Sequence, residues 1–127
     1  MRPFARRLAF AAALAAALPA AAHGDLFPLR GGLVAWSNEL SVELVRQAEG
    51  GVLVFVDDHG TPVPLQGATG ALDITRGDRT ATLALAALPS NGMAAPDVAL
   101  QPGDKLQVIV NLPDGQVVLA RLVVPFS

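Results

Sequence analysis

Cysteine is absent from the 127 residues, and aromatic side chains are scarce. Without cysteine the chain has no disulfide, no thiolate metal site, no cysteine nucleophile and no thiol redox chemistry. Any metal must therefore be held by nitrogen and oxygen atoms. An oxidative copper enzyme acting on polysaccharide needs a flat aromatic surface, and the chain after position 22 offers only Phe27, Trp36, Phe55 and Phe126.

Motifs of conventional catalysis are missing as well. Ser37, Ser41, Ser90 and Ser127 lack the surroundings of a nucleophile elbow. The sequence has no paired carboxylates, no Gly-rich phosphate loop and no metalloprotease helix motif. We therefore predict that the protein is not an enzyme.

The start of the chain has the parts of a secretory signal peptide. Arg2, Arg6 and Arg7 precede an apolar stretch over residues 8–18, and small residues follow it. A membrane-spanning helix needs about 20 apolar residues, so this stretch is too short to be one. The Arg6–Arg7 pair lacks the flanking residues of a twin-arginine signal. We expect a leader over residues 1–22, export by the general secretory route to the periplasm, and no membrane insertion after cleavage.

The cleavage site decides which residue begins the exported chain. Cleavage after Ala22 puts the small residue Ala20 at the minus-three position, whereas cleavage after Ala20 or Ala21 would put Leu18 or Pro19 there. The preferred cut makes His23 the first residue. Its α-amine has an unperturbed pKa of about 7.7–8.0 and lies beside an imidazole, so the two nitrogens form a bidentate clamp for a divalent metal.

Charge excludes two classes of partner. The leader removes three of the nine basic residues and none of the eleven acidic ones, which leaves six basic, eleven acidic and a net charge of −5. Nucleic acids and anionic membrane surfaces both require clustered Lys and Arg. We expect neither as a partner.

Short apolar runs with alternation follow position 32, and Gly, Pro, Asn and Asp separate them about every ten residues. This pattern is typical of an all-β sandwich or barrel. We predict an N-terminal arm over residues 23–31 and one immunoglobulin-like antiparallel β-sandwich domain of about seven strands over residues 32–127. The predicted strands are Gly32–Trp36, Leu40–Gln47, Val52–Val56, Gly70–Thr75, Thr80–Leu85, Leu106–Leu112 and Gln116–Val124.

Particular segments refine this expectation. The β-branched run Val52–Val56 indicates a central strand covered on both faces, and Pro62 and Pro64 keep the next segment out of interior pairing. Gly77–Asp78 predicts a II′ hairpin turn. The resulting hairpin aligns four apolar side chains on one face: Leu72, Ile74, Leu83 and Leu85.

Two later segments are read from their turn residues. Ala86–Pro96 is expected to be an irregular loop, in which Met93 is either a hydrophobic plug or a thioether ligand. Pro113-Asp114-Gly115 predicts the turn of a closing hairpin.

The segments Val56–Val63, Gly70–Ile74, Leu88–Gly92 and Val117–Val124 resemble a group of small proteobacterial periplasmic proteins of unsettled function. Those proteins begin His-Gly-Gly and carry an Asp-His-Gly-x-Pro turn, whereas residues 23–25 here are His-Gly-Asp. A similar segment precedes the adaptor core of CzcB-type heavy-metal efflux pumps. The resemblance implies a periplasmic metal-handling context and an efflux-pump or other envelope protein as a partner.

The spacing of Asp57 and His59 is similar to the Asp-x-His ligand pair of CopC-type copper carriers, small β-sandwiches whose exported chain begins with His. Residues i and i+2 of an extended segment face one side, so both side chains would converge on one ion while Asp58 points away. An amine, two imidazoles and a carboxylate suit Cu(II), with Zn(II) as competitor. We predict a metal site of His23, Asp57 and His59, with Asp58 in reserve.

The predicted function is that of a periplasmic Cu(II) or Zn(II) carrier, or of an accessory protein of heavy-metal resistance and efflux. Two structural interpretations stand beside it: His23 in a frayed tail, and Asp57–Gly60 as a simple turn. Trp36 is expected to be a core or rim anchor. The alternative function is a metal-free β-sandwich interaction module that contacts an envelope or efflux partner.

Overall fold

The computed structural model describes residues 26–126, so the predicted leader and His23 lie outside the described residues. Within this range the regular structure consists of nine strands and no helix. The strands are β3 (Leu33–Ser37), β4 (Leu40–Arg46), β5 (Val52–Asp58), β6 (Thr61–Pro62), β7 (Thr69–Arg76), β8 (Arg79–Ala87), β9 (Met93–Ala95), β10 (Lys105–Asn111) and β11 (Val117–Val123). The predicted all-β class is confirmed.

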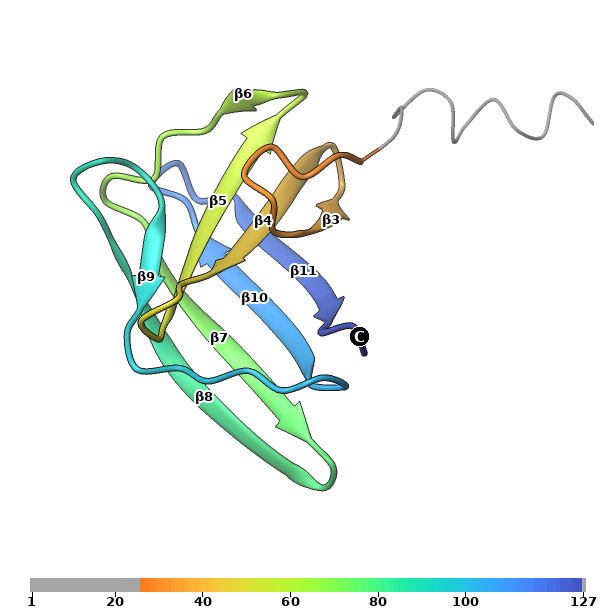
Figure 1. Ribbon diagram of the computed structural model, residues 1–127. Coiled ribbons are helices and arrows are strands. Elements are labelled where there is room, and N and C mark those ends of the chain that lie inside the picture. Colours follow the sequence, from red (N-terminus) through yellow and green to blue (C-terminus); the bar gives the residue numbers. More distant parts are fainter. Residues whose placement is uncertain (1–25, 127) are drawn as a thin grey trace, which may run out of the picture.

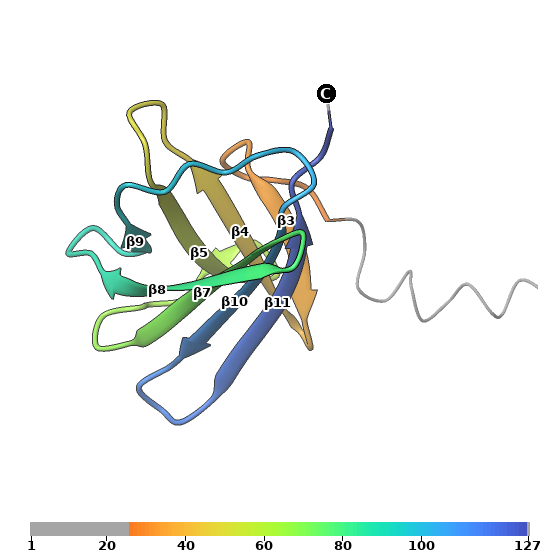
Figure 2. The ribbon, with the colours of Figure 1, turned by 90° about the horizontal axis from the view of Figure 1, so that it is seen from below.

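All the strands belong to one antiparallel sheet, in the order β11-β10-β7-β8-β9-β5-β4-β3, and β6 pairs with the end of β5 (Figure 1). The sheet curls until its end strands β3 and β11 lie side by side (Figure 2). The Leu119 N–H of β11 donates to the Ser37 Oγ of β3 at 2.9 Å. The described chain is therefore nearly closed into a barrel, and a division into two immunoglobulin-like sheets is not confirmed.

The hydrophobic core fills the inside of this barrel. Successive side chains of a strand face opposite sides of a sheet, so alternate residues of each strand reach the core. Val52, Val54 and Val56 of β5 are buried there, whereas Leu53 and Phe55 on the outer side are half-buried. β5 is thus a central strand, as expected, but its outer face is only partly covered.

The β7–β8 hairpin confirms the clearest prediction from the sequence. Leu72 pairs with Leu83 and Gly70 with Leu85, so the four predicted apolar side chains share the core face. Gly77 has φ +65° and Asp78 does not have a positive φ, as a II′ turn requires. The closing β10–β11 hairpin is also present.

The expectation of an irregular loop over Ala86–Pro96 is wrong at both of its ends. β8 continues through Ala87, and Met93–Ala95 forms β9, which pairs with both β5 and β8. Only the intervening residues form a turn, in which Asn91 has φ +72°. Met93 is fully buried, as a hydrophobic plug would be.

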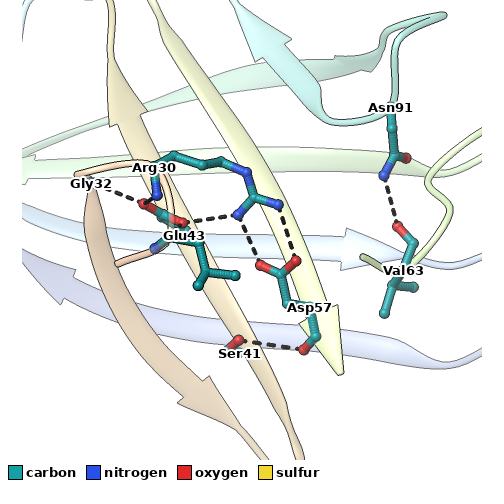
Figure 3. Close-up of polar contacts among 8 residues, drawn as sticks. Arg30, Gly32, Ser41, Glu43, Asp57, Val63 and Asn91 are labelled. Carbon is teal, nitrogen blue, oxygen red and sulfur yellow. Dashed lines mark hydrogen bonds and ion pairs between the residues drawn. The ribbon is translucent and has the colours of Figure 1, made fainter. Parts of the chain in front are cut away.

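The segment after β6 has one further bond to the sheet, from the Val63 N–H to the Val56 carbonyl at 2.8 Å, and it is also tied to this turn. The Asn91 side chain accepts a hydrogen bond from the Leu65 N–H at 2.8 Å. It donates one to the Val63 carbonyl at 3.2 Å (Figure 3). The Pro-containing segment therefore stays out of interior pairing, as predicted, and the two-residue strand β6 ends at Pro62.

Candidate functional site

The two described residues of the predicted metal site lie where β5 turns into β6. Asp57 is within β5, and His59 lies in the two-residue loop between Asp58 and Thr61, which pair with each other. His59 has φ +51° and Gly60 has φ +86°. Positive φ at both central residues defines a type I′ turn, the tight turn that suits a right-twisted hairpin.

The turn changes the geometry that the Asp-x-His spacing implies. The alternation rule applies only to extended backbone, and β5 ends at Asp58. Because His59 adopts the left-handed conformation, its side chain does not follow the direction of the Asp57 side chain. The simple-turn interpretation of Asp57–Gly60 is confirmed for the backbone of His59 and Gly60. This turn places the His59 ring at the tip of a hairpin.

Asp58 is the carboxylate that contacts His59. The His59 Nδ1 atom lies 2.7 Å from Asp58 Oδ1, and both side chains are more than half exposed. An ionised carboxylate only accepts hydrogen bonds, so Nδ1 carries the proton in this contact. In the neutral ring Nε2 then keeps its lone pair, which is the state that binds a metal.

Asp57 has a different set of partners. Its carboxylate is 2% exposed, and both oxygens accept hydrogen bonds from Arg30: Nη1 to Oδ2 at 2.9 Å and Nη2 to Oδ1 at 3.0 Å. The Ser41 hydroxyl donates to the Asp57 backbone carbonyl at 3.4 Å. The predicted carboxylate ligand is therefore engaged in an ion pair in the described chain.

Glu43 completes this ion pair on the neighbouring strand. It is 1% exposed and accepts hydrogen bonds from Arg30 Nη1 at 2.9 Å and from the backbone N–H groups of Leu29, Arg30 and Gly32 at 3.2, 2.8 and 2.8 Å (Figure 3). We call Arg30, Glu43 and Asp57 the Arg30 clamp. These acidic residues raise the pKa of Arg30, chiefly through the hydrogen bond from Arg30 to Asp57.

The Arg30 clamp attaches the N-terminal arm to the outer face of the barrel. The Arg30 guanidinium also lies over the Phe55 ring, 4.1 Å from its centroid, in cation–π geometry. At Gly32 a Cβ atom would collide with the Leu44 carbonyl oxygen, so only glycine lets the arm approach β4 this closely. The arm crosses β4 and β5 in Figure 1.

A surface hollow joins the arm to the His59 turn. Leu26 and Phe27 of the arm, Trp36 of β3, and His59 and Gly60 of the turn are among the residues that line it. Phe27 is exposed and Trp36 is half-buried, so the predicted rim role of Trp36 agrees with its position. The described start of the chain therefore lies beside the histidine at the hairpin tip.

Sequence reasoning missed Arg30 and Glu43. Strand alternation places Glu43 on the face opposite Val42 and Leu44, which reach the core, and a charged residue there is ordinarily solvated. The sequence did hold one signal that a segment covers this face: each of two adjacent apolar strands carries a polar residue on its non-core side. The register that aligns Ser41 with Asp57 and Glu43 with Phe55 is not visible in the sequence.

Within residues 26–126, no three or more His, Asp or Glu side chains gather into a group able to hold a metal ion. No helix in this part of the chain is long and apolar enough to cross a membrane. Comparisons with protein-family models, with curated proteins and with solved structures found no match for this chain. The resemblances to periplasmic metal-handling proteins therefore stay predictions.

Proposed function

We propose that the exported chain binds one divalent cation in the periplasm, Cu(II) in preference to Zn(II), as a carrier, buffer or accessory protein of heavy-metal efflux. The proposed ligands are the α-amine and imidazole of His23, the Nε2 atom of His59 and one carboxylate oxygen. This neutral nitrogen and oxygen set matches the preference of Cu(II) for tetragonal coordination. The protein has no proposed catalytic activity.

The observation that carries this proposal is the shared hollow of Leu26, Phe27 and His59. His23 precedes Leu26 by three residues, and an extended chain covers at most about 3.3–3.6 Å per residue. His23 is thus tethered within about 10 Å of a residue that lines the same hollow as His59. A tether of this length favours one chelate over two separate sites, because it raises the local concentration of the second ligand.

The contact between Asp58 and His59 supports His59 as a ligand. Metal-binding histidines ordinarily donate their second ring N–H to a carboxylate or carbonyl, which fixes the tautomer and orients the ring. Asp58 accepts such a bond from His59 Nδ1. Asp57 can supply the carboxylate ligand only by giving up Arg30, which donates to both of its oxygens.

Titration of the mature protein with Cu(II) at neutral pH tests the proposal. We expect binding near 1:1, weakened by His23→Ala and by His59→Ala. One extra residue before His23 should weaken binding as much as His23→Ala, because the extension removes the terminal amine from the chelate. Absence of bound copper, or an affinity unchanged by His23→Ala, would contradict the proposal, as would a mature chain that begins at another residue.

A second candidate is the metal-free interaction module. Val117, Leu119 and Val123 stand exposed on the outer side of β11, opposite the face that packs into the core. Arg121 lies between Leu119 and Val123 on this face, and exposed apolar residues beside a charged one are a feature of partner-binding surfaces. Co-purification with and without a chelator separates the two functions: an envelope partner retained equally in both conditions favours the module, and a metal-dependent partner favours the carrier.

A further inference from the structure

The outer face of β7, β10 and β11 carries a second hollow, which shares no lining residue with the hollow beside His59. These three strands are neighbours in the sheet (Figure 1). Alternate side chains of each strand point away from the core, and the register aligns them in rows across the strands. One row is Asp73, Gln107 and Arg121, and the next is Thr75, Lys105 and Val123. Together they line a volume of about 370 Å³, which we call the Arg121 hollow.

Three charged side chains of the Arg121 hollow have no ion pair within residues 26–126, namely Asp73, Lys105 and Arg121. Asp73 accepts hydrogen bonds from neutral groups alone, from Thr82 Oγ1 at 2.7 Å and from Gln107 Nε2 at 3.5 Å. The register explains why opposite charges do not meet. Lys105 is paired across the strands with Thr75, and Gln107 separates Asp73 from Arg121.

Two other arginines show how this chain pairs a cation with a buried carboxylate. One belongs to the Arg30 clamp. The other is Arg76, whose Nε donates to Asp104 Oδ1 at 2.8 Å and whose Nη2 donates to Oδ2 at 2.7 Å. Asp104 is 1% exposed, and we call Arg76 and Asp104 the Arg76 clamp. The guanidinium of Arg121 has no such partner in the described chain, so it is free to bind an external carboxylate.

From this arrangement we infer that the Arg121 hollow binds a small zwitterion, an α-amino acid. Its carboxylate contacts Arg121 and Lys105, and its ammonium group contacts Asp73. The planar fork of an arginine matches both oxygens of a carboxylate, and a lysine adds a point charge. Lys105 and Arg121 are diagonal neighbours on β10 and β11, about 7–8 Å apart, which two long side chains bridge. The site is separate from the proposed metal site and does not rest on it.

Asp73 is the reason to expect a zwitterion and not a simple anion. Its charge repels an anion held at Lys105 and Arg121, whereas it attracts an ammonium group on the same ligand. Asp73 and Arg121 lie on the two strands that flank β10, so about 10 Å separates their backbones. Charge-assisted hydrogen bonds of about 2.8 Å at each end take up more than half of this span. The remainder suits the short separation of the two charges in an α-amino acid.

The edge of the Arg121 hollow favours an aliphatic amino acid. Val123 is 57% exposed, and Leu119, two positions earlier on the same face of β11, is 37% exposed. An aliphatic side chain that covers Val123 removes apolar surface of both partners from water. L-Leucine is therefore the first probe.

The experiment follows backbone amide chemical shifts of the metal-free exported protein by nuclear magnetic resonance, in the presence of a chelator. The three probes are L-leucine, 4-methylpentanoate, which lacks the ammonium group, and 3-methylbutylamine, which lacks the carboxylate. We expect saturable shifts at Asp73, Gln107 and Arg121 with leucine. Each truncated probe should bind at least about 3- to 5-fold more weakly, the range for loss of one exposed ion pair.

Variants assign the charges to the two ends of the ligand. Arg121→Gln should weaken the binding of leucine and of 4-methylpentanoate, and Lys105→Gln should act in the same direction. Asp73→Asn should weaken the binding of leucine but strengthen that of 4-methylpentanoate, because it removes a repelling charge. Arg46→Gln and Asp97→Asn are the matched controls: they make the same charge changes at exposed residues outside the Arg121 hollow and should leave every affinity unchanged.

Three results would overturn the inference. The first is the absence of saturable shifts at the Arg121 hollow with leucine. The second is an equal effect of Arg121→Gln and Arg46→Gln, which would show that general charge governs binding. The third is tighter binding of leucine by Asp73→Asn, which would show a site for anions and not for zwitterions. Opposite signs of the Asp73→Asn effect for leucine and 4-methylpentanoate would support it.

Discussion

Two arginine–carboxylate clamps attach irregular segments to this barrel. They differ in how many carboxylates the arginine pairs with and in how exposed the arginine side chain is. Arg30 serves two carboxylates, and its side chain is 25% exposed; Arg76 serves one, and its side chain is 46% exposed. Asp104 has a further donor in the Gln101 N–H at 2.8 Å, and Arg76 also donates to the Ala99 carbonyl at 3.1 Å. Asp57 depends on Arg30 for both of its side-chain oxygens.

The two clamps hold different parts of the barrel surface. Both fix a segment that has no strand pairing of its own. Only the Arg30 clamp lies next to a segment that leads toward the His59 turn, whereas the Arg76 clamp secures the connection between β9 and β10. Removing either clamp should therefore lower the free energy of unfolding, but by different amounts.

The largest effect is expected from removing Arg30. Arg30→Ala leaves Asp57 buried without its donors and reduces Glu43 to its backbone partners, and breaking a buried ion pair from one side costs about 3 kcal/mol or more. Arg76→Ala should cost less, because Asp104 keeps the Gln101 N–H and Arg76 itself is nearly half exposed. Urea unfolding followed by circular dichroism measures both free energies. Equal losses of unfolding free energy in the two variants would show that both clamps stabilise the fold to the same extent.

A smaller effect, confined to a pH range, is expected at the Arg76 clamp. The hydrogen bond from Arg76 holds the pKa of Asp104 below its usual value, against the opposing effect of burial. Because the folded pKa is below the unfolded value of about 3.9, ionised Asp104 stabilises the fold above that pH, and the stabilisation is lost as pH falls through the folded pKa.

Urea unfolding of wild type and Arg76→Gln at several pH values tests this linkage. The difference in free energy of unfolding between them should be largest above about pH 5 and should shrink as pH falls below about 4. A difference that stays constant across this range would show that Arg76 acts through packing instead of through charge. Asp104→Asn is the control, since its own stability should lack this pH-dependent contribution.

The strands of the barrel could largely be predicted from the sequence, because alternation and turn residues are local signals. The Gly77–Asp78 turn illustrates this, since one glycine in the right position specifies the hairpin. β9 could not be found in this way, because three residues show no periodicity and turn residues precede them. Closure of the sheet through Ser37 and Leu119 depends on accumulated twist, which no local pattern records.

The candidate site was predictable in part. A turn after the Val52–Val56 strand was predicted correctly, but β5 continues through Asp58 and only His59 and Gly60 form the turn. The direction of the His59 side chain depends on a positive φ that the Asp-x-His spacing does not encode. The role of Arg30 depends on the register between β4 and β5, which brings Glu43 and Asp57 under one side chain. Contacts of this kind arise from strand pairing, so sequence spacing alone does not reveal them.

The smallest expected effect concerns a single exposed carboxylate, which is compared with another exposed carboxylate elsewhere on the barrel. Asp58→Asn keeps the size of the side chain but removes the charged acceptor for His59 Nδ1, so the ring is less firmly held with Nε2 free. We expect Cu(II) affinity to fall about 10-fold, the low end for a residue that orients a ligand, because the pair is exposed to solvent. Asp97→Asn is the matched control: it removes the same charge from an exposed residue in the segment secured by the Arg76 clamp, and asparagine tolerates the φ of +59° found there. Titration calorimetry with Cu(II) compares the two variants. A similar loss in both would mean that general charge, and not the orientation of His59, accounts for the effect of Asp58.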